Sequence, residues 1–160
     1  MEKLWAPWRV KYIRGLMGSK GCFMCKYAKN KKQDAKNHVL LRSKLLLVVM
    51  NAFPYNNGHL MVAPYRHVGE IQKLTKDEML DLMATLSRSI SILKKALKPD
   101  GFNVGINIGK VAGAGLPGHL HIHVVPRWNG DTNFMPVLGE TKVVSQALDE
   151  TFKMLKNSVK

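Results

Sequence analysis

The sequence predicts an α+β domain in which one long helix covers a mostly antiparallel β-sheet. Three observations support this fold class: short apolar, β-branched runs recur along the chain, one long segment carries a helical apolar stripe, and strands and helices do not alternate regularly. With 160 residues and no internal repeat, the chain has the usual length of one domain. Residues 1–160 are therefore interpreted as a single domain.

The first fifty residues predict an aromatic segment, a short helix and two strands. Residues 1–14 hold Trp5 and Trp8, which are expected to pack at a subunit interface, with stacking on a base as the alternative. Cys22 to Lys32 predicts a turn and a short helix. His38 to Val49 is apolar and β-branched but interrupted by three polar residues, which predicts two strands joined by a tight turn.

The middle of the chain predicts a third strand and then the long helix. His59 to Ala63 predicts the strand, which Pro64 is expected to end. Thr75 to Leu97 predicts the helix, because Thr75 and Glu78 match a capping box. Apolar residues at steps of three and four form the stripe expected to face the sheet: Met79, Leu82, Met83, Leu86, Ile90, Leu93 and Leu97.

Two more strands and a last helix are expected in the C-terminal part. Phe102 to Ile108 and His119 to Val125 predict strands on either side of a glycine-rich loop. Val143 to Leu155 predicts a helix, whose apolar face is formed by Val144, Leu148, Phe152 and Leu155.

Three histidines alternate with aliphatic residues in the last predicted strand. Because successive side chains of a strand point to opposite faces, His119, His121 and His123 are expected to point one way, roughly 7 Å apart from one to the next. The aliphatic residues between them are expected to point into the core. Such a row can bind metal, transfer protons near neutral pH or attack phosphorus as neutral imidazole.

The loop before these histidines, residues 109–118, contains four glycines. Glycine lets the backbone approach a ligand and turn its N–H groups toward an anion, so the loop predicts a phosphate held beside the imidazoles. Asn103 and Asn107 lie on one face of the preceding strand and offer amide donors, although a polar exposed face explains them equally well.

The net charge of +14 is concentrated near the N-terminus, where residues 1–50 hold 12 Lys and Arg against Glu2 and Asp34. This field attracts small polyphosphates or nucleic acid, or the lysines only keep the surface soluble. The chain has no recognised nucleic-acid motif, so a nucleic-acid partner is the weakest hypothesis. No apolar run approaches the 18 residues of a membrane span, and no secretory signal is evident, so a cytoplasmic location is expected.

Several motifs together resemble the histidine triad (HIT) family of nucleotide hydrolases and transferases. The histidine row carries the family's His-x-His-x-His pattern, Gly58 to His67 resembles its strand ending in histidine, and Asn107-x-Gly109 resembles the segment before its active loop. The resemblance covers about residues 20–127. Trp5 to Arg9 and Arg127 to Phe134 are similar to the branch that includes bacterial diadenosine tetraphosphate phosphorylases.

The resemblance implies a five-stranded antiparallel sheet with a long central helix and a C-terminal helix, joined across a homodimer. It also implies cleavage of a phosphoanhydride bond in a dinucleoside polyphosphate, by hydrolysis or phosphorolysis, through a nucleotidyl-histidine intermediate. A nucleotide- or protein-binding module with negligible turnover is the alternative.

By the same resemblance, His121 is the nucleophile, with a backbone carbonyl holding the proton on its other ring nitrogen. His123 and His59 would contact the phosphate oxygens and either could protonate the leaving group, while Asn107, Gly115 and Gly118 would bind the nucleotide. Many family members carry Ser, Thr or Gln just before the triad. Here Leu-Pro-Gly stands at those positions, which leaves the leaving-group acid open.

The two cysteines, Cys22 and Cys25, could be a metal clip, a redox pair or a local disulfide, and a reducing compartment favours the first two. The resemblance adds His67 and His119, which complete a two-Cys, two-His structural zinc site. A zinc ligand cannot also contact substrate, so His119 would then be separated from the catalytic histidines.

Overall fold

The computed structural model describes residues 21–132 and 146–159. The expectations for Trp5, Trp8, residues 133–134, Val143 and Val144 lie outside the described residues. Within the described part, no helix is long and apolar enough to cross a bilayer.

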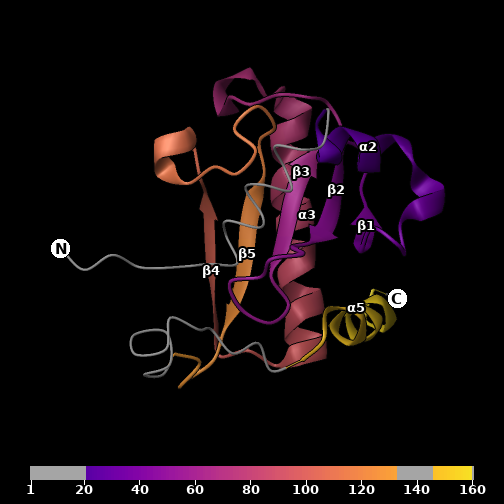
Figure 1. Ribbon diagram of the computed structural model, residues 1–160, viewed down its shortest axis with the longest axis vertical. Helices are drawn as coiled ribbons and strands as arrows, with labels where there is room; N and C mark the ends of the chain where they lie inside the picture. Colours follow the sequence, from indigo (N-terminus) through magenta and orange to yellow (C-terminus); the bar gives the residue numbers. More distant parts are fainter. Residues whose placement is uncertain (1–20, 133–145, 160) are drawn as a thin grey trace.

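Five strands form one antiparallel sheet, in the order β1-β2-β3-β5-β4 (Figure 1). The five-stranded antiparallel sheet that the family resemblance implies is confirmed. The strand bounds are β1 Val39–Arg42, β2 Leu46–Met50, β3 Leu60–Pro64, β4 Gly101–Ile106 and β5 Ile122–Arg127.

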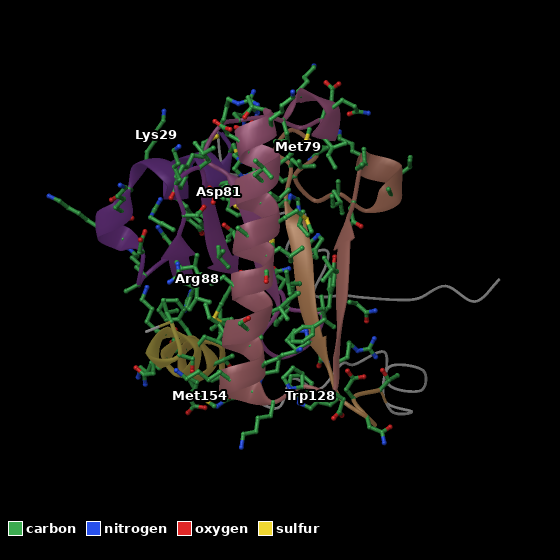
Figure 2. All side chains as sticks on the ribbon, turned by 180° about the vertical axis from the view of Figure 1, so that it is seen from behind. Lys29, Met79, Asp81, Arg88, Trp128 and Met154 are labelled. Carbon is green, nitrogen blue, oxygen red and sulfur yellow. The ribbon has the colours of Figure 1, made fainter. Side chains whose placement is uncertain are left out.

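The long helix α3, Lys76–Leu97, covers one face of the sheet (Figures 1 and 2). Its first turn has the expected capping box, with the Thr75 side chain accepting from the Glu78 N–H and the Glu78 carboxylate accepting from the Thr75 N–H. The main apolar core lies between this helix and the sheet, and Leu82, Leu86 and Leu93 belong to it.

The predicted apolar stripe is wrong at two of its residues. Met79 and Met83 are exposed on the outer side of α3, and polar residues take buried positions instead. Glu78 is buried because Arg66 donates two hydrogen bonds to its carboxylate, and Ser89 is buried because its hydroxyl donates to the Thr85 carbonyl. Because each of these polar groups has a hydrogen-bond partner inside the fold, the buried face of α3 includes polar residues as well as apolar ones.

A second, smaller apolar cluster lies on the opposite face of the sheet. There α2, Phe23–Lys29, packs Met24 against residues of three strands. The helix α5, Leu148–Asn157, packs beside α3 and β1. Within residues 21–132 and 146–159, the remaining short helical turns are η1 Lys31–Gln33, η2 Ile71–Lys73 and η3 Lys110–Ala112.

The last strand begins later than the sequence predicts, at Ile122 instead of His119. The backbone N–H of His119 donates to the Leu116 carbonyl, and that of Leu120 donates to the Val68 carbonyl, 2.6 Å away. Both backbone N–H groups hydrogen-bond to loop carbonyls. The segment before Ile122 therefore runs beside residues 67–69 and does not pair with a strand of the sheet. Pro64 is the last residue of β3, in agreement with its expected role as the end of that strand.

Candidate active site and metal cluster

One row of residues crosses the sheet from the histidines to the second apolar cluster. His123 of β5 pairs with Met61 of β3, Met61 pairs with Val49 of β2, and Val49 pairs with Val39 of β1. Paired residues point to the same face, so the His123 ring shares its face with the cluster under α2. Leu120, Ile122 and Val124 belong to the core under α3, as the alternation predicted.

His121 is buried, and its tautomer is fixed by the backbone. Its Nδ1 lies 2.9 Å from the carbonyl oxygen of His119, which can only accept a hydrogen bond. The neutral ring therefore carries its proton on Nδ1 and has a lone pair on Nε2. The backbone carbonyl expected beside this histidine is present.

His59 and His123 form a buried pair whose hydrogen bond has a defined direction. The backbone N–H of Tyr55 donates to His59 Nδ1 at 3.0 Å, and the Asn51 side-chain amide donates to the same atom at 3.3 Å. A neutral His59 must then carry its proton on Nε2, which donates to His123 Nδ1 at 2.9 Å. His123 is left with its own proton on Nε2, and it is a donor there.

Burial favours the neutral form of His123. Burial, together with the neighbouring His121, lowers the pKa of His123 to about 4. The rings of His121 and His123 meet edge to face with centroids 4.9 Å apart. An unprotonated Nε2 on His121 thus lies beside a ring that offers an N–H from its Nε2, an arrangement suited to attack on an electrophile whose oxygens accept hydrogen bonds.

His119 is turned to a different site. Its Nε2 donates to the Pro64 carbonyl at 2.8 Å, so the lone pair of Nδ1 faces the Cys22 sulfur, 3.2 Å away. Cys25 Sγ lies 3.3 Å from His67 Nδ1 and 3.6 Å from His119 Nδ1. The ligand atoms of these four residues all lie within 4.8 Å of one another.

The donor set fits a tetrahedral zinc ion. Bond lengths of about 2.3 Å to sulfur and about 2.1 Å to nitrogen place a sulfur and a nitrogen ligand about 3.6 Å apart, near the distances between Cys25 and the two histidines. Both cysteines are free thiols. The hydrogen bond from His119 to Pro64 is the kind of outer contact that orients a ligating imidazole.

The predicted phosphate-binding residues differ in their positions and contacts. Asn107 follows Ile106, whose pairing with Ile122 is the last ladder pair of β4 with β5, and its side-chain amide donates to the Gly113 carbonyl at 3.5 Å. Gly115 and Gly118 are exposed in the loop that leads into His119. Asn103 has a different role, because its side-chain Oδ1 accepts a hydrogen bond from the Arg127 guanidinium.

A cavity of about 380 Å³ opens on the same face of the sheet as His123. Met61 and Val49 form part of its lining, and Met61 pairs directly with His123. Asn51, which donates to His59, lines it as well. The paired histidines do not line the cavity themselves but are joined to it through Met61 and Asn51, and its size is that of a small-molecule site.

Sequence reasoning missed three residues of this region. Asn51 and Tyr55 set the tautomer of His59 but belong to no chemical motif, although they lie only eight and four residues before it. Gly69 touches the glycine-rich loop: a Cβ there would lie 2.8 Å from the Pro117 carbonyl oxygen. Only the folded chain brings this glycine to the loop.

Comparison with known proteins identifies the family to which this fold and these histidines belong. The HIT domain model matches residues 32–130. The AP-4-A phosphorylase of Mycobacterium tuberculosis is 41% identical over 97% of this chain and 83% of its own length. The uncharacterized HIT-like protein MJ0866 of Methanocaldococcus jannaschii is 32% identical over 83% of this chain and 99% of its own length.

Among solved structures, a Zn-bound histidine triad family protein from Mycobacterium smegmatis superposes with a TM-score of 0.69. It covers 87% of this chain and 93% of its own, at 24% identity, and the likeness shows a shared fold.

Proposed function

The chain belongs to the HIT domain family, and we propose that it cleaves a phosphoanhydride bond of a dinucleoside polyphosphate through a nucleotidyl intermediate on His121. The observation that carries the proposal is the fixed pair of tautomers. His121 presents a lone pair on Nε2 because its Nδ1 donates to a carbonyl, and the neighbouring His123 presents an N–H.

In the first step, Nε2 of His121 attacks the α-phosphorus of the substrate. A phosphorus–nitrogen bond forms while the bond from phosphorus to the bridging oxygen breaks, and the remaining nucleoside polyphosphate leaves with that electron pair. The ring becomes cationic but keeps its Nδ1 proton. The carbonyl of His119, 2.9 Å from that nitrogen, stabilises the charge.

The paired histidines stabilise the phosphoryl oxygens during both steps. His123 donates from Nε2 to the oxygens, and His59 holds it in the donating tautomer. Asn107 and the backbone N–H groups near Gly115 and Gly118 add further donors around the polyphosphate. The chain has no hydroxyl or amide side chain just before the triad, so these groups carry the stabilisation here.

The second step releases the nucleotide. Water or inorganic phosphate attacks the same phosphorus, and the bond to His121 Nε2 breaks with its electron pair returning to the ring. Attacking water loses one proton to the solvent, and the ring is again neutral with its proton on Nδ1. Water gives a nucleoside monophosphate and phosphate gives a diphosphate. The 41% identity to a relative named AP-4-A phosphorylase favours phosphate as the acceptor.

The cavity beside the paired histidines is the proposed nucleoside site. Its apolar lining, which includes Met61 and Val49, suits a base and a ribose. Because Met61 pairs with His123, a nucleoside in the cavity directs its 5′-phosphate to the histidines.

Cys22, Cys25, His67 and His119 are proposed to hold zinc. A closed site of four protein ligands supplies structural stability rather than an open position for substrate. Both cysteines are free, and the proposed location is the cytoplasm, where thiols stay reduced.

A homodimer is proposed to form along β4. This strand is at the edge of the sheet, and Val104 on it is 45% exposed. Pairing with a second copy would cover the free edge. Light scattering during gel filtration tests this assembly.

Turnover of diadenosine tetraphosphate, with and without excess phosphate, tests the function. Phosphorolysis yields ADP and ATP, whereas hydrolysis yields AMP and ATP. A protein that binds AMP but leaves the dinucleotide intact under both conditions would be a binding module, and the proposal would be wrong.

A further inference from the structure

The cavity has an end wall built from two segments far apart in sequence. His38 immediately precedes β1, and Leu148 opens α5; both line the cavity. Strand β1 lies three positions from β5 in the sheet, about 14 Å at the usual strand spacing. The wall therefore lies at the end of the cavity away from His123. Helix α5 lies beyond residue 130, where the match to the HIT domain ends.

His38 is held in one position by several contacts. Its backbone has φ 53°, a left-handed conformation that non-glycine residues seldom adopt. Its Nε2 lies 2.6 Å from the Asp149 carboxylate on α5, and its ring meets Phe152 edge to face at 5.2 Å. Its carbonyl accepts from the Met50 N–H. These contacts orient the imidazole at the cavity wall before any ligand binds.

The contact with Asp149 also determines what His38 offers to a ligand. A carboxylate only accepts, so Nε2 carries the proton, and in the neutral ring Nδ1 is an acceptor. Among the described residues, Nδ1 of His38 has no hydrogen-bond partner. The end wall therefore presents the Nδ1 acceptor of His38 beside Lys36 and Asn37, while the rest of the cavity lining is largely apolar.

We propose that His38, oriented by Asp149, is a base-specificity residue: its Nδ1 accepts a hydrogen bond from the 6-amino group of adenine. A purine with a 6-oxo group presents a second acceptor to the same nitrogen, and neither group is then satisfied. The inference rests on the proposed function, because it takes the cavity as the nucleoside site. It adds a preference for 6-aminopurines and assigns that preference to a contact made by α5.

Calorimetric binding of AMP and IMP tests this, since the two nucleotides differ in the group at position 6. The wild-type protein is expected to bind AMP about tenfold more tightly, the size of one hydrogen bond. Asp149→Ala frees the tautomer of His38 without altering its backbone and should reduce the ratio to about threefold or less. His38→Asn, which tolerates the left-handed conformation, should bring the ratio near one.

Glu150→Ala is the matched control, because it removes an exposed acidic residue from the same turn of α5 and should leave the ratio unchanged. Equal affinities in the wild type, or a ratio that survives in both variants, would overturn the proposal. Turnover of diadenosine tetraphosphate is measured on the same wild-type sample. An active enzyme without base preference refutes the role of His38 alone, whereas absence of both binding and turnover refutes the proposed function itself.

Discussion

Nε2 of His59 lies 2.9 Å from Nδ1 of His123, and the hydrogen bond between them runs from His59 to His123. Its direction follows from the Tyr55 backbone N–H, which occupies the other nitrogen of His59. His123 and His121 are consequently held as opposite tautomers, one with a proton on Nε2 and one with a lone pair there. Each role depends on a backbone group that a side-chain substitution does not remove.

His121→Ala is expected to lower kcat on diadenosine tetraphosphate by about 10⁴-fold or more, because the covalent route loses its nucleophile. Binding of AMP should persist, since the cavity is lined by other residues. In the wild type, mass spectrometry after a quench without acid should locate the nucleotidyl adduct on this histidine. An adduct on another side chain, or an active variant, would refute the assignment.

The pH dependence of stability should reveal the low pKa of His123. The folded pKa is about 4, against an ordinary value of 6.5, so the unfolded chain binds more protons between these pH values. The free energy of unfolding should therefore fall as the pH drops from 6.5 to 4, by roughly 1–3 kcal/mol. Urea unfolding at several pH values measures this change.

A His123→Gln variant is expected to show a shallower fall over the same range. Part of the fall should remain, because burial also lowers the pKa of His119. Glu78 does not interfere: Arg66 lowers its pKa to about 2, so its contribution is lost only below pH 4.5. Identical slopes for the wild type and the variant would contradict the neutral state of His123.

Removal of the proposed zinc should destabilise the protein. Elemental analysis should find about one zinc per chain, and a strong chelator should lower Tm, because the metal joins α2 to the segment before β5. Without any chelator, the Cys25→Ser variant should already have a Tm below that of the wild-type protein. Adding the chelator to this variant should lower its Tm little further. Undamaged protein with less than about a tenth of an equivalent of zinc would rule the site out.

Gly69→Ala should impair turnover although the residue lies outside the histidine row and the glycine-rich loop before it. The added Cβ would lie 2.8 Å from the Pro117 carbonyl oxygen and 3.2 Å from backbone atoms of Gly118, so the loop must move. We expect kcat to fall by about 10- to 100-fold, the usual cost of small displacements at a site. Gly101→Ala is the control, because nothing lies within 4 Å of its Cβ position. Equal kcat values for the two variants would contradict the prediction.

The sequence predicted the strands, the long helix and the histidine row because local patterns determine them, whereas the division of the histidines into a catalytic and a metal-binding group came from the family resemblance. Alternation alone indicated that His121 and His123 share a face opposite to Ile122, and the core confirms it. The start of β5 was wrong, since Leu120 bonds to Val68, and no local pattern reports a partner fifty residues away.

The wall of the cavity could not be predicted either. His38 and Asp149 are 111 residues apart, and neither belongs to a motif. Their contact depends on how α5 packs beside β1, which is decided by tertiary packing. The direction of the hydrogen bond between His59 and His123 could not be predicted from the sequence either, because it depends on a backbone N–H in a loop.

The row that joins His123, Met61 and Val49 has a consequence for engineering the protein. A larger side chain at position 61 would narrow the cavity and press on the neighbouring imidazole at once. Substrate range and rate are therefore expected to change together when this position is altered. Directed evolution toward bulkier nucleosides would have to begin at the opposite end of the cavity, where the walls do not touch the reacting groups.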